Sequence, residues 1–367
     1  MFENNINNDI NLGKIQKLKN DYFEELNPII KEYFSVLSEE IPDFLYEYIN
    51  TKEMKRANNI GQDCGTYYTK IFNNKFYYSI LDHSIGVALI IWHFTKDKKQ
   101  TLSGLFHDIS TPVFKHCIDF LNGDHETQES TEKLTTRIIE NSNEIMELLK
   151  RDGISIEEIN NYKLYPIADN NTPKLSADRL EYTLSCGIYF EPVWNIEEIK
   201  TFYNNIEVLK NEDKIIELGF KNISVAEEFI SRASKIWPQW ICNEDKLTMQ
   251  FLADTVKKMV DKNYLTLDEL YTISEEDVIK RIKNCTDTSI SKAFNLFRNS
   301  TSIGESEEKV KGKYCISVNS KRRYVNPLVK TEYGIKRIYD VSHIAKASID
   351  KYLAYKTKKY AYLDFNF

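Results

Sequence analysis

The residues best suited to chemistry in this sequence are histidines and aspartates that gather between residues 83 and 125. His83 begins a strongly apolar segment, His107 and Asp108 are adjacent, and Asp178 follows much later in the segment LSADRLEYTLS. Imidazole and carboxylate groups suit a hard-to-borderline divalent metal ion and leave coordination positions open for water. Brought together on one ion, these four side chains would make water a nucleophile for a phosphorus centre near neutral pH.

A second group of histidines could move the proton that such a hydrolysis requires. His116 and Asp119 are three residues apart, so they share one face of a helix. His125 follows in GDHETQES, where a nearby carboxylate would keep the imidazole protonated and able to donate to a leaving oxygen. One His–Asp pair carries little information in a chain this long, so the prediction depends on the whole set. We interpret His93 and His343 as structural histidines.

Helices must position these side chains, and the composition favours helices. The 367 residues include only 12 glycines and 8 prolines, below the usual shares of roughly 7% and 5%, which disfavours a turn-rich β fold. An apolar helix is predicted over 83–97, and a helix over 174–187 places Leu175, Asp178 and Tyr182 on one face. Further helical spacing occurs over 12–50 with breaks near Pro28 and Pro42, and over 101–108, 113–121, 127–150, 195–210, 223–236, 245–262 and 274–299.

The pattern changes near residue 300. TSIGESEE has the small and acidic residues of a linker, and YCISV and RRYVNPLV beyond it predict a small pair of strands. Helical spacing returns over 339–353, and YAYLDFNF is expected to close the chain as a strand. Nine basic residues and one acidic residue occur between 309 and 337. This basic segment is either a solvated strand face or a site for a phosphate-bearing ligand or nucleic acid, and the sequence leaves both open.

Charge and apolar segments limit the class of protein. The net charge of −6 argues against coating of nucleic acid by the whole chain. The longest apolar run, Ile85–Trp92, is much shorter than the roughly 20 residues that span a bilayer. MFENNINNDI lacks the features of a secretory signal, so we expect a cytoplasmic protein with no membrane partner. The six scattered cysteines form no CxxC pair, and we expect reduced thiols rather than a zinc site.

Four short segments occur in a characteristic order. MKRANNIGQDCGTYY precedes His83, HDISTPVFKHCID and HETQES follow it, and ADRLEY comes last. The order His83, His107-Asp108, Asp178 resembles the H…HD…D signature of the HD-domain metal-dependent phosphohydrolases. The four segments together are similar to the branch that contains the deoxynucleoside triphosphate triphosphohydrolases. The resemblance covers about residues 40–190 and weakens toward residue 300.

The resemblance implies a fold and a division of the chain. The fold is all-α, an HD-domain helical core with a small α+β appendage at the C-terminus. Residues 1–39 would form an N-terminal helical extension, 40–190 the HD catalytic core, 191–300 its helical completion, and 301–367 the basic α+β segment. The resemblance also allows a homo-oligomer.

The resemblance implies a metal centre and a set of residues around it. The metal ligands would be His83, His107, Asp108 and Asp178, and the ion would be Mn²⁺, Fe²⁺, Zn²⁺, Ni²⁺ or Mg²⁺. His125 matches the catalytic histidine, Asp119 the carboxylate that supports it, and His116 a histidine that contacts substrate phosphate. The substrate contacts would be Gln62 to the sugar, Arg179 to a phosphate, and Tyr182 beside the sugar and base.

Three positions depart from the pattern of that branch. Thr111 stands where a second histidine usually follows the HD pair, which removes one member of the catalytic acid network. Ile80 replaces an arginine that contacts phosphate, and Cys186 replaces an aspartate that grips a sugar hydroxyl. The metal set is therefore expected to be intact and the substrate contacts to be altered.

We therefore expect a metal-dependent hydrolase of a nucleotide-type phosphate ester. One form would convert a dNTP to a deoxynucleoside and triphosphate, and another would be a phosphomonoesterase that releases orthophosphate. The alternative from a different class is a nucleotide-sensing or nucleic-acid-binding protein. It would use the HD scaffold as a ligand pocket without turnover and the segment 309–337 for recognition.

Overall fold

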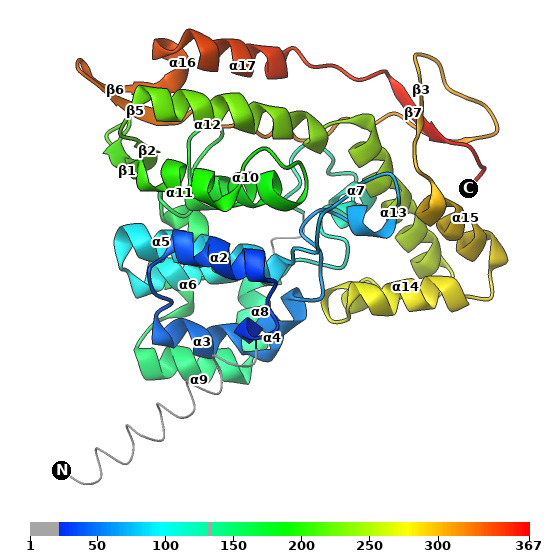
Figure 1. Ribbon diagram of the computed structural model, residues 1–367. Coiled ribbons are helices and arrows are strands. Elements are labelled where there is room, and N and C mark those ends of the chain that lie inside the picture. Colours follow the sequence, from blue (N-terminus) through cyan, green and yellow to red (C-terminus); the bar gives the residue numbers. More distant parts are fainter. Residues whose placement is uncertain (1–21, 131–133) are drawn as a thin grey trace.

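Helix α5 (Ile80–Thr95) lies inside the larger of two hydrophobic clusters in the computed structural model, which describes residues 22–130 and 134–367 (Figure 1). The helix begins after Ser79, whose side chain and that of Asp82 form a capping box. Every residue from Ile80 to Ile91 is buried. A helix that is apolar on nearly all sides belongs in the interior, and here it packs against α2 (Pro28–Leu37), α4 (Lys52–Ala57), α6 (Lys98–Phe106) and α10 (Ala177–Tyr189).

The other described elements follow one another along the chain. The α-helices are α2 (Pro28–Leu37), α3 (Asp43–Ile49), α4 (Lys52–Ala57), α6 (Lys98–Phe106), α7 (Cys117–Leu121), α8 (Thr135–Asn141), α9 (Asn143–Asp152), α10 (Ala177–Tyr189), α11 (Ile196–Asn204), α12 (Ile223–Ile236), α13 (Asn243–Asp261), α14 (Glu275–Asn284), α15 (Thr288–Asn299), α16 (Ile338–Val341) and α17 (His343–Leu353). The 3₁₀ helices are η1 (Thr66–Tyr68), η3 (Ile156–Glu158), η4 (Tyr162–Leu164), η5 (Trp237–Trp240) and η6 (Asp268–Tyr271). The strands are β1 (Ile206–Lys210), β2 (Ile216–Phe220), β3 (Gly304–Ser306), β4 (Tyr314–Ile316), β5 (Leu328–Thr331), β6 (Gly334–Arg337) and β7 (Tyr360–Leu363).

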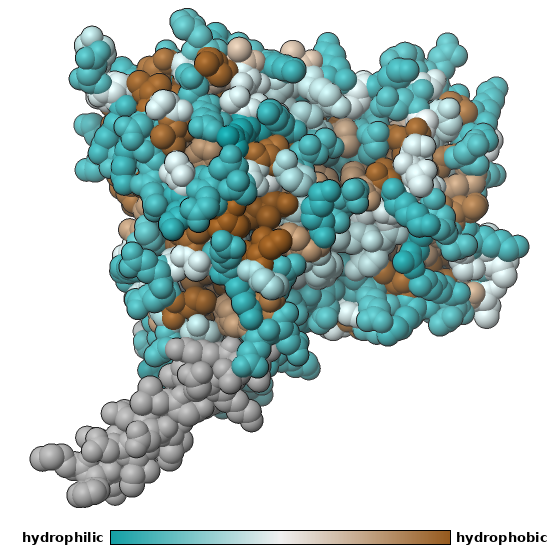
Figure 2. Space-filling model, in the orientation of Figure 1, coloured by the Kyte–Doolittle hydropathy of each residue, from teal (hydrophilic) through white to brown (hydrophobic). Residues whose placement is uncertain are grey.

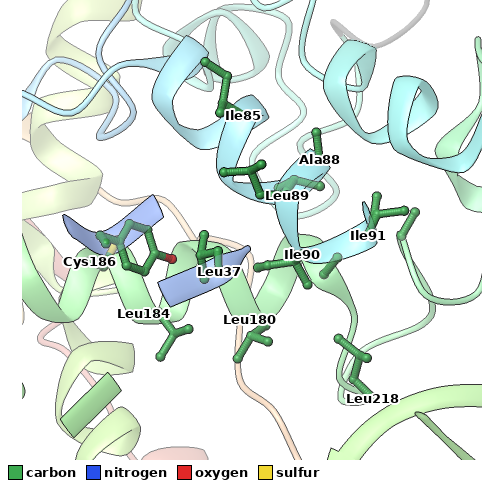
Figure 3. Packing of buried hydrophobic residues seen from close by; sticks show 14 of the residues in the cluster. Leu37, Ile85, Ala88, Leu89, Ile90, Ile91, Leu180, Leu184, Cys186 and Leu218 are labelled. Atoms are coloured by element: carbon green, nitrogen blue, oxygen red, sulfur yellow. The ribbon is translucent and has the colours of Figure 1, made fainter. Parts of the chain in front are cut away.

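Helix α10 packs closely against α5 in the larger of two hydrophobic clusters. Figure 3 shows side chains of α5 such as Leu89 and Ile90 beside Leu180 and Leu184 of α10. Each such side chain contributes about 1.5–3 kcal/mol when fully buried. The two helices lie close together at Gly86, where a Cβ atom would lie 2.7 Å from a side-chain carbon of Glu181. This close approach brings the start of α10 beside the start of α5.

A second hydrophobic cluster lies on the other side of the molecule, around α13, α14 and α15 (Figure 1). It includes apolar residues of α7 and of the C-terminal strands β4 and β7. Cys64, just before η1, belongs to this cluster, whereas Tyr78, just before α5, belongs to the larger one. The segment that joins them therefore passes between the two clusters.

Two small sheets complete the fold. One has the strand order β1-β2-β5-β6, in which β2 and β5 are parallel and the other pairs antiparallel. The other has the order β3-β7-β4, and both of its pairs are antiparallel. The strand expected in YAYLDFNF is confirmed as β7. The strands expected in YCISV and RRYVNPLV also occur, but β4 and β5 pair with other strands rather than with each other.

The all-α expectation is therefore correct only in part, because the protein is mostly helical but β1 and β2 lie within the segment expected to complete the helical core. The helix expected over 195–210 ends at Asn204, and the chain continues as β1. Asn211 then accepts hydrogen bonds from the backbone of Asp213 and Ile215, which closes the turn of a hairpin. Spacing of apolar residues by four fits both a helix and a strand, so periodicity alone misassigned this short segment.

The helical expectations near the N-terminal half have mixed outcomes. The breaks near Pro28 and Pro42 are confirmed, since these residues stand at the starts of α2 and α3. The single helix expected over 127–150 is instead two helices, because the chain leaves helical geometry at Ser142, whose side chain caps α9. Residues 1–21 of the expected N-terminal extension and residues 131–133 lie outside the described residues.

Hydrophilic residues cover most of the face shown in Figure 2, with hydrophobic residues in scattered groups. Among residues 22–130 and 134–367, no helix combines the length and the apolar character that crossing a membrane requires. The division of the chain into four parts stays a prediction, and each hydrophobic cluster draws residues from more than one of them.

Candidate metal centre and active site

The four side chains predicted to bind a metal ion converge where α5, α6 and α10 meet. His83 and Asp178 lie in the first turns of α5 and α10, and His107 and Asp108 directly follow α6. His83 Nε2 is 3.2 Å from His107 Nε2 and 3.1 Å from Asp178 Oδ1. Asp108 Oδ2 is 4.0 Å from the first of these nitrogens and 3.7 Å from the second. Such separations suit donors that surround one ion at roughly 2.0–2.2 Å from each.

The Nδ1 atom of each of these two histidines is already engaged by another group of the protein. His83 Nδ1 contacts a carboxylate oxygen of the fully buried Glu181, and His107 Nδ1 is 2.7 Å from the carbonyl oxygen of Gly104. Each ring is thus held with Nε2 toward the other donors, as metal-binding histidines usually are. The donor set and its orientation therefore fit a divalent ion.

The charges at this site also favour a cation. Burial would raise the pKa of Asp108, but Lys115 and the neighbouring histidines hold that pKa well below its usual range. Burial would also raise the pKa of Asp178, but a hydrogen bond from His83 and the charges of the nearby histidines outweigh burial and lower that pKa. Burial lowers the pKa of His83, whereas Glu181 and Asp178 outweigh it and raise the pKa to about 9. A metal ion at Nε2 would have to displace that proton, so metal affinity should fall in acid.

A cavity of about 560 Å³ opens over these ligands. Its wall combines residues of both hydrophobic clusters, such as Cys186 of the larger one and Met249 of the second. This volume lies within the range of roughly 300–1,000 Å³ that is common for small-molecule sites. The cationic side chains that line it are Lys115, Lys163, Arg179, Lys321 and Arg323. The cavity therefore suits an anionic small molecule beside a metal ion.

His116 and Asp119 form a hydrogen-bonded pair at the edge of this cavity. His116 Nδ1 is 2.8 Å from Asp119 Oδ2, and Ser130 donates to the other oxygen of this buried carboxylate at 2.5 Å. The His116 ring lines the cavity. Burial, together with Arg323 and Lys115, outweighs Asp119 and lowers the pKa of His116 to about 4. Asp119 thus orients the His116 ring, and the surroundings of the ring favour the neutral imidazole.

His125 occupies a different position from the one that the resemblance implied. Asp119, expected to support His125, instead binds His116. The His125 ring packs edge-on against Phe120, and its Nε2 is 3.1 Å from the side-chain oxygen of Gln250. Among the described residues that line the cavity, His125 does not occur. The reason is geometric, because His116 and Asp119 share one turn of chain whereas the loop that follows α7 carries His125 away.

The three residues predicted to contact substrate all line the cavity, but other groups of the protein already bind them to different extents. Gln62 accepts a hydrogen bond from Lys115 Nζ at 3.0 Å, and Tyr182 packs edge-on against Trp240. Arg179 is mostly committed to the protein, because Nε donates to the carbonyl of Lys174 at 2.6 Å and Nη2 lies 3.0 Å from Asp169. Its role as a phosphate contact stays a prediction.

The three departures from the family pattern also have clear locations. Ile80 is fully buried in the larger hydrophobic cluster, and Thr111 lies in the turn after Asp108, where its carbonyl accepts from Arg56 at 2.6 Å. Only Cys186 lines the cavity, and its Sγ is 4.0 Å from a carboxylate oxygen of Asp63. A carboxylate is thus present at this part of the cavity, although it comes from a different segment.

Several cavity residues were not found by sequence reasoning. Burial raises the pKa of Asp63 to about 6 and that of Asp245 to about 8, and both line the cavity. Arg323 reaches the cavity from the basic segment 309–337, for which a phosphate-bearing ligand was one of two expectations. Glu181 does not line the cavity but contacts His83 Nδ1, and its signal was its place three residues after Asp178 on the same helix.

The sequence is similar over part of its length to that of known proteins. No family model matches the chain. It is 25% identical to the uncharacterized protein YdhJ of Bacillus subtilis over 248 residues, which are 66% of this chain and 73% of that protein. It is 26% identical over 152 residues to the metal-dependent phosphohydrolase cns2 of Cordyceps militaris, 40% of this chain and 41% of that protein. The match with cns2 thus spans less than half of either protein.

A solved structure extends the comparison to most of the chain. The crystal structure of a phosphohydrolase from Bacteroides thetaiotaomicron superposes with a TM-score of 0.59 over 88% of this chain and 96% of that one, at 15% identity. The chain has the fold of this phosphohydrolase. At this level of identity the similarity concerns the fold, and the chemistry has to be argued from the site itself.

Proposed function

We propose that this protein is a metal-dependent phosphohydrolase that acts on a phosphate ester of the nucleotide type. The observation that carries the proposal is the convergence of His83, His107, Asp108 and Asp178 on one point beneath a cavity lined by cationic side chains. The similarity to cns2, itself a metal-dependent phosphohydrolase, supports the same class of reaction. When bound, a divalent ion would polarise a phosphoryl oxygen and make water nucleophilic at neutral pH.

The surrounding side chains have clear tasks in such a hydrolysis. Lys115 Nζ lies 3.4 Å from Asp108 Oδ2, close enough to the metal ligands to offset the charge of a phosphoryl group held there. His116 faces the cavity with Nε2 while Asp119 holds Nδ1, so His116 is positioned to pass a proton to a leaving oxygen. An arriving phosphate would favour the protonated imidazole that this step needs.

The rest of the cavity supports a nucleotide-type substrate. Tyr182 and Trp240 offer aromatic surfaces, and Asp63 and Asp245 offer carboxyl oxygens that could accept hydrogen bonds from sugar hydroxyls. We propose two forms of the reaction for this substrate. Cleavage at the innermost phosphate of a dNTP would release triphosphate, and cleavage of a monophosphate would release orthophosphate.

The proposal is tested by a nucleotide panel. The protein is loaded with Mn²⁺ or Mg²⁺ and assayed with nucleoside mono-, di- and triphosphates, and the released phosphates are separated by ion chromatography. We expect turnover that chelation abolishes and that Asp108→Ala removes while the fold, checked by circular dichroism, is kept. The absence of turnover on every nucleotide, in protein shown to contain metal, would contradict the proposal.

A paired substitution separates the two candidate acid residues. We expect His116→Gln to lower kcat by about 10²–10⁴-fold, the usual contribution of general acid catalysis. His125→Gln should change kcat much less, because His125 does not line the cavity and contacts Phe120 and Gln250. The measurement is steady-state kinetics with equal metal content in both variants. A larger loss in the His125 variant would restore the assignment that the resemblance implied.

The binding-protein alternative predicts a continuous basic surface over 309–337. In the structure the basic residues of this segment are distributed over β5, β6 and the loops before them, and several pair with acids. Lys330 and Arg337 pair with Glu207 and Glu217, and Lys313 pairs with Asp364. Paired charges contribute little to nucleic-acid affinity, which depends on cations free to neutralise phosphates. The hydrolase therefore remains our proposal.

A further inference from the structure

We propose that Arg323, carried into the cavity by the C-terminal segment, is a residue that binds substrate phosphate. The inference deepens the proposed function, on which it rests, by assigning a phosphate contact that lies far from the histidine and aspartate segments in sequence. The segment that carries it, Asn319–Asn326, is here called the strap. Three observations lead to this assignment: how the strap is fixed, what Arg323 contacts, and how the other cavity cations are paired.

The strap is fixed by contacts that do not involve the Arg323 side chain. Val325 is almost fully buried in the larger hydrophobic cluster. The backbone of Asn326 donates to the carbonyl of Pro173 at 2.7 Å, and the backbone of Arg323 donates to the hydroxyl of Tyr352 at 3.2 Å. The Arg322 side chain donates to the carbonyls of Tyr352 and Tyr355 at 3.1 and 2.7 Å. The guanidinium of Arg323 is therefore not needed to hold the strap in place.

The Arg323 guanidinium is directed at the proposed acid. Its Nη2 lies 2.6 Å from the side-chain oxygen of Gln128 and 3.3 Å from His116 Nε2. Gln128 is uncharged, and burial together with Arg323 lowers the pKa of the His116 ring. An anion that enters beside His116 could accept from both Arg323 and His116, and charge-assisted hydrogen bonds of this kind are about twice as strong as neutral ones. The position of the guanidinium beside His116 Nε2 thus marks the place of a phosphate oxygen.

The pairing of the other cavity cations distinguishes Arg323 from them. Lys115 pairs with Asp108, Arg179 with Asp169, and both Lys163 and Lys321 with Glu129. Within residues 22–130 and 134–367, Arg323 is the one cavity cation that forms no ion pair. Burial raises the pKa of Asp245 in the same cavity, and the charge of Arg323 opposes this effect without an ion pair between them. A half-buried guanidinium that forms no ion pair gains more from a bound anion than a paired cation does, and its planar fork suits two phosphate oxygens.

The test measures phosphate binding separately from turnover. Full-length protein loaded with Mn²⁺ is titrated calorimetrically with inorganic phosphate and with tripolyphosphate, for the wild type, Arg323→Ala and Arg323→Lys. We expect Arg323→Ala to weaken binding by about 10- to 100-fold, the size expected for a lost charged hydrogen bond, and Arg323→Lys to recover only part of it. KM for the best substrate should rise in the same order.

The control is Lys330→Ala, which removes another cationic side chain of the C-terminal segment. Lys330 pairs with Glu207 on an exposed part of β5 and does not line the cavity, so its loss should change phosphate affinity by less than about threefold. Equal affinity in wild type and Arg323→Ala, an equal loss in Lys330→Ala, or no binding of either probe to the wild type would overturn the inference. Binding that depends on Arg323 without turnover of any nucleotide would uphold it and refute the proposed hydrolase.

Discussion

At the scale of single residues, the site depends on side chains that do not bind the metal themselves. Glu181 is fully buried, contacts His83 Nδ1 with one oxygen, and accepts from the hydroxyl of Tyr78 at 2.6 Å with the other. A buried carboxylate in this place fixes the tautomer of His83 and makes its Nε2 a stronger donor to a metal. The absence of a side chain at Gly86 is what allows Glu181 to reach this position.

This arrangement makes a prediction for Glu181→Gln. The amide keeps the volume but loses the charge that supports His83, so we expect metal affinity to fall by about 10- to 100-fold. The measurement is competition with a chromophoric chelator at fixed pH. Tyr33→Phe serves as the control, because Tyr33 makes only a long contact of 3.3 Å with the same carboxylate. Unchanged metal affinity in Glu181→Gln would show that the carboxylate has no part in presenting His83.

At the scale of elements, α14 holds together two loops that form the cavity. Its first residue, Glu275, is fully buried and accepts from the backbone of Gly61 and Phe114, both at 3.1 Å, and from the hydroxyl of Tyr68 at 2.5 Å. Gly61 precedes Gln62, and Phe114 precedes Lys115 in a turn where both residues have positive φ angles of 64° and 50°. Such angles cost free energy in residues other than glycine. Glu275 therefore stabilises the turn that presents Lys115 and His116.

We expect Glu275→Gln to lower the free energy of unfolding by about 1–3 kcal/mol, because an amide has one acceptor oxygen for three donors and turns its NH₂ group toward the others. Chemical denaturation at pH 8 measures this change. Glu276→Gln is the matched control at the next, exposed position of α14, and its effect should stay within about 0.5 kcal/mol. Similar stability of the two variants would mean that the buried contacts contribute nothing net.

At the scale of the whole molecule, the cavity lies where the two hydrophobic clusters meet and where the C-terminal strap crosses them. The protein carries a net charge of −6, and its cavity also contains buried acids. Burial raises the pKa of Asp63 to about 6, of Glu275 to about 7 and of Asp245 to about 8. A carboxyl group whose pKa is higher in the folded protein than in the unfolded chain destabilises the folded state when it loses its proton.

Above about pH 7 the folded protein keeps protons on its raised acids, chiefly Asp245, that the unfolded chain has lost, so the stability of the metal-free protein should fall as pH rises toward 9. Below pH 7 Asp63 and Glu275 act in the same direction, whereas the lowered pKa of His116 acts in the opposite one. The raised pKa of His83 also lowers stability as pH rises, since its stabilising proton is lost near pH 9. Thermal unfolding at several pH values measures the slope. Asp245→Asn should flatten it between pH 6 and pH 9, and an unchanged slope would contradict the raised pKa of Asp245.

Local patterns were enough to anticipate much of this molecule. Apolar periodicity located α5 and α10, proline positions located the starts of α2 and α3, and the residue types at 83, 107, 108 and 178 anticipated a metal centre. These properties depend on residues only a few positions apart in the chain, so the sequence alone was enough to predict them. The hairpin β1-β2 and the break at Ser142 were missed because short apolar patterns fit more than one geometry.

The sequence by itself determined the mostly helical class and the types of the four side chains that we propose as metal ligands, because helical spacing and ligand type are local properties. It also indicated the pair of His116 and Asp119, which are three residues apart. Only the tertiary structure decided that Asp63 lies beside Cys186 and that Arg323 reaches His116 across 207 positions of sequence. Those contacts depend on how distant helices and the strap pack around two hydrophobic clusters, and no periodicity within a single segment encodes them. The cavity wall was therefore predictable only in part: Gln62, Arg179 and Tyr182 line it, as do Asp63 and Asp245, which the structure alone revealed.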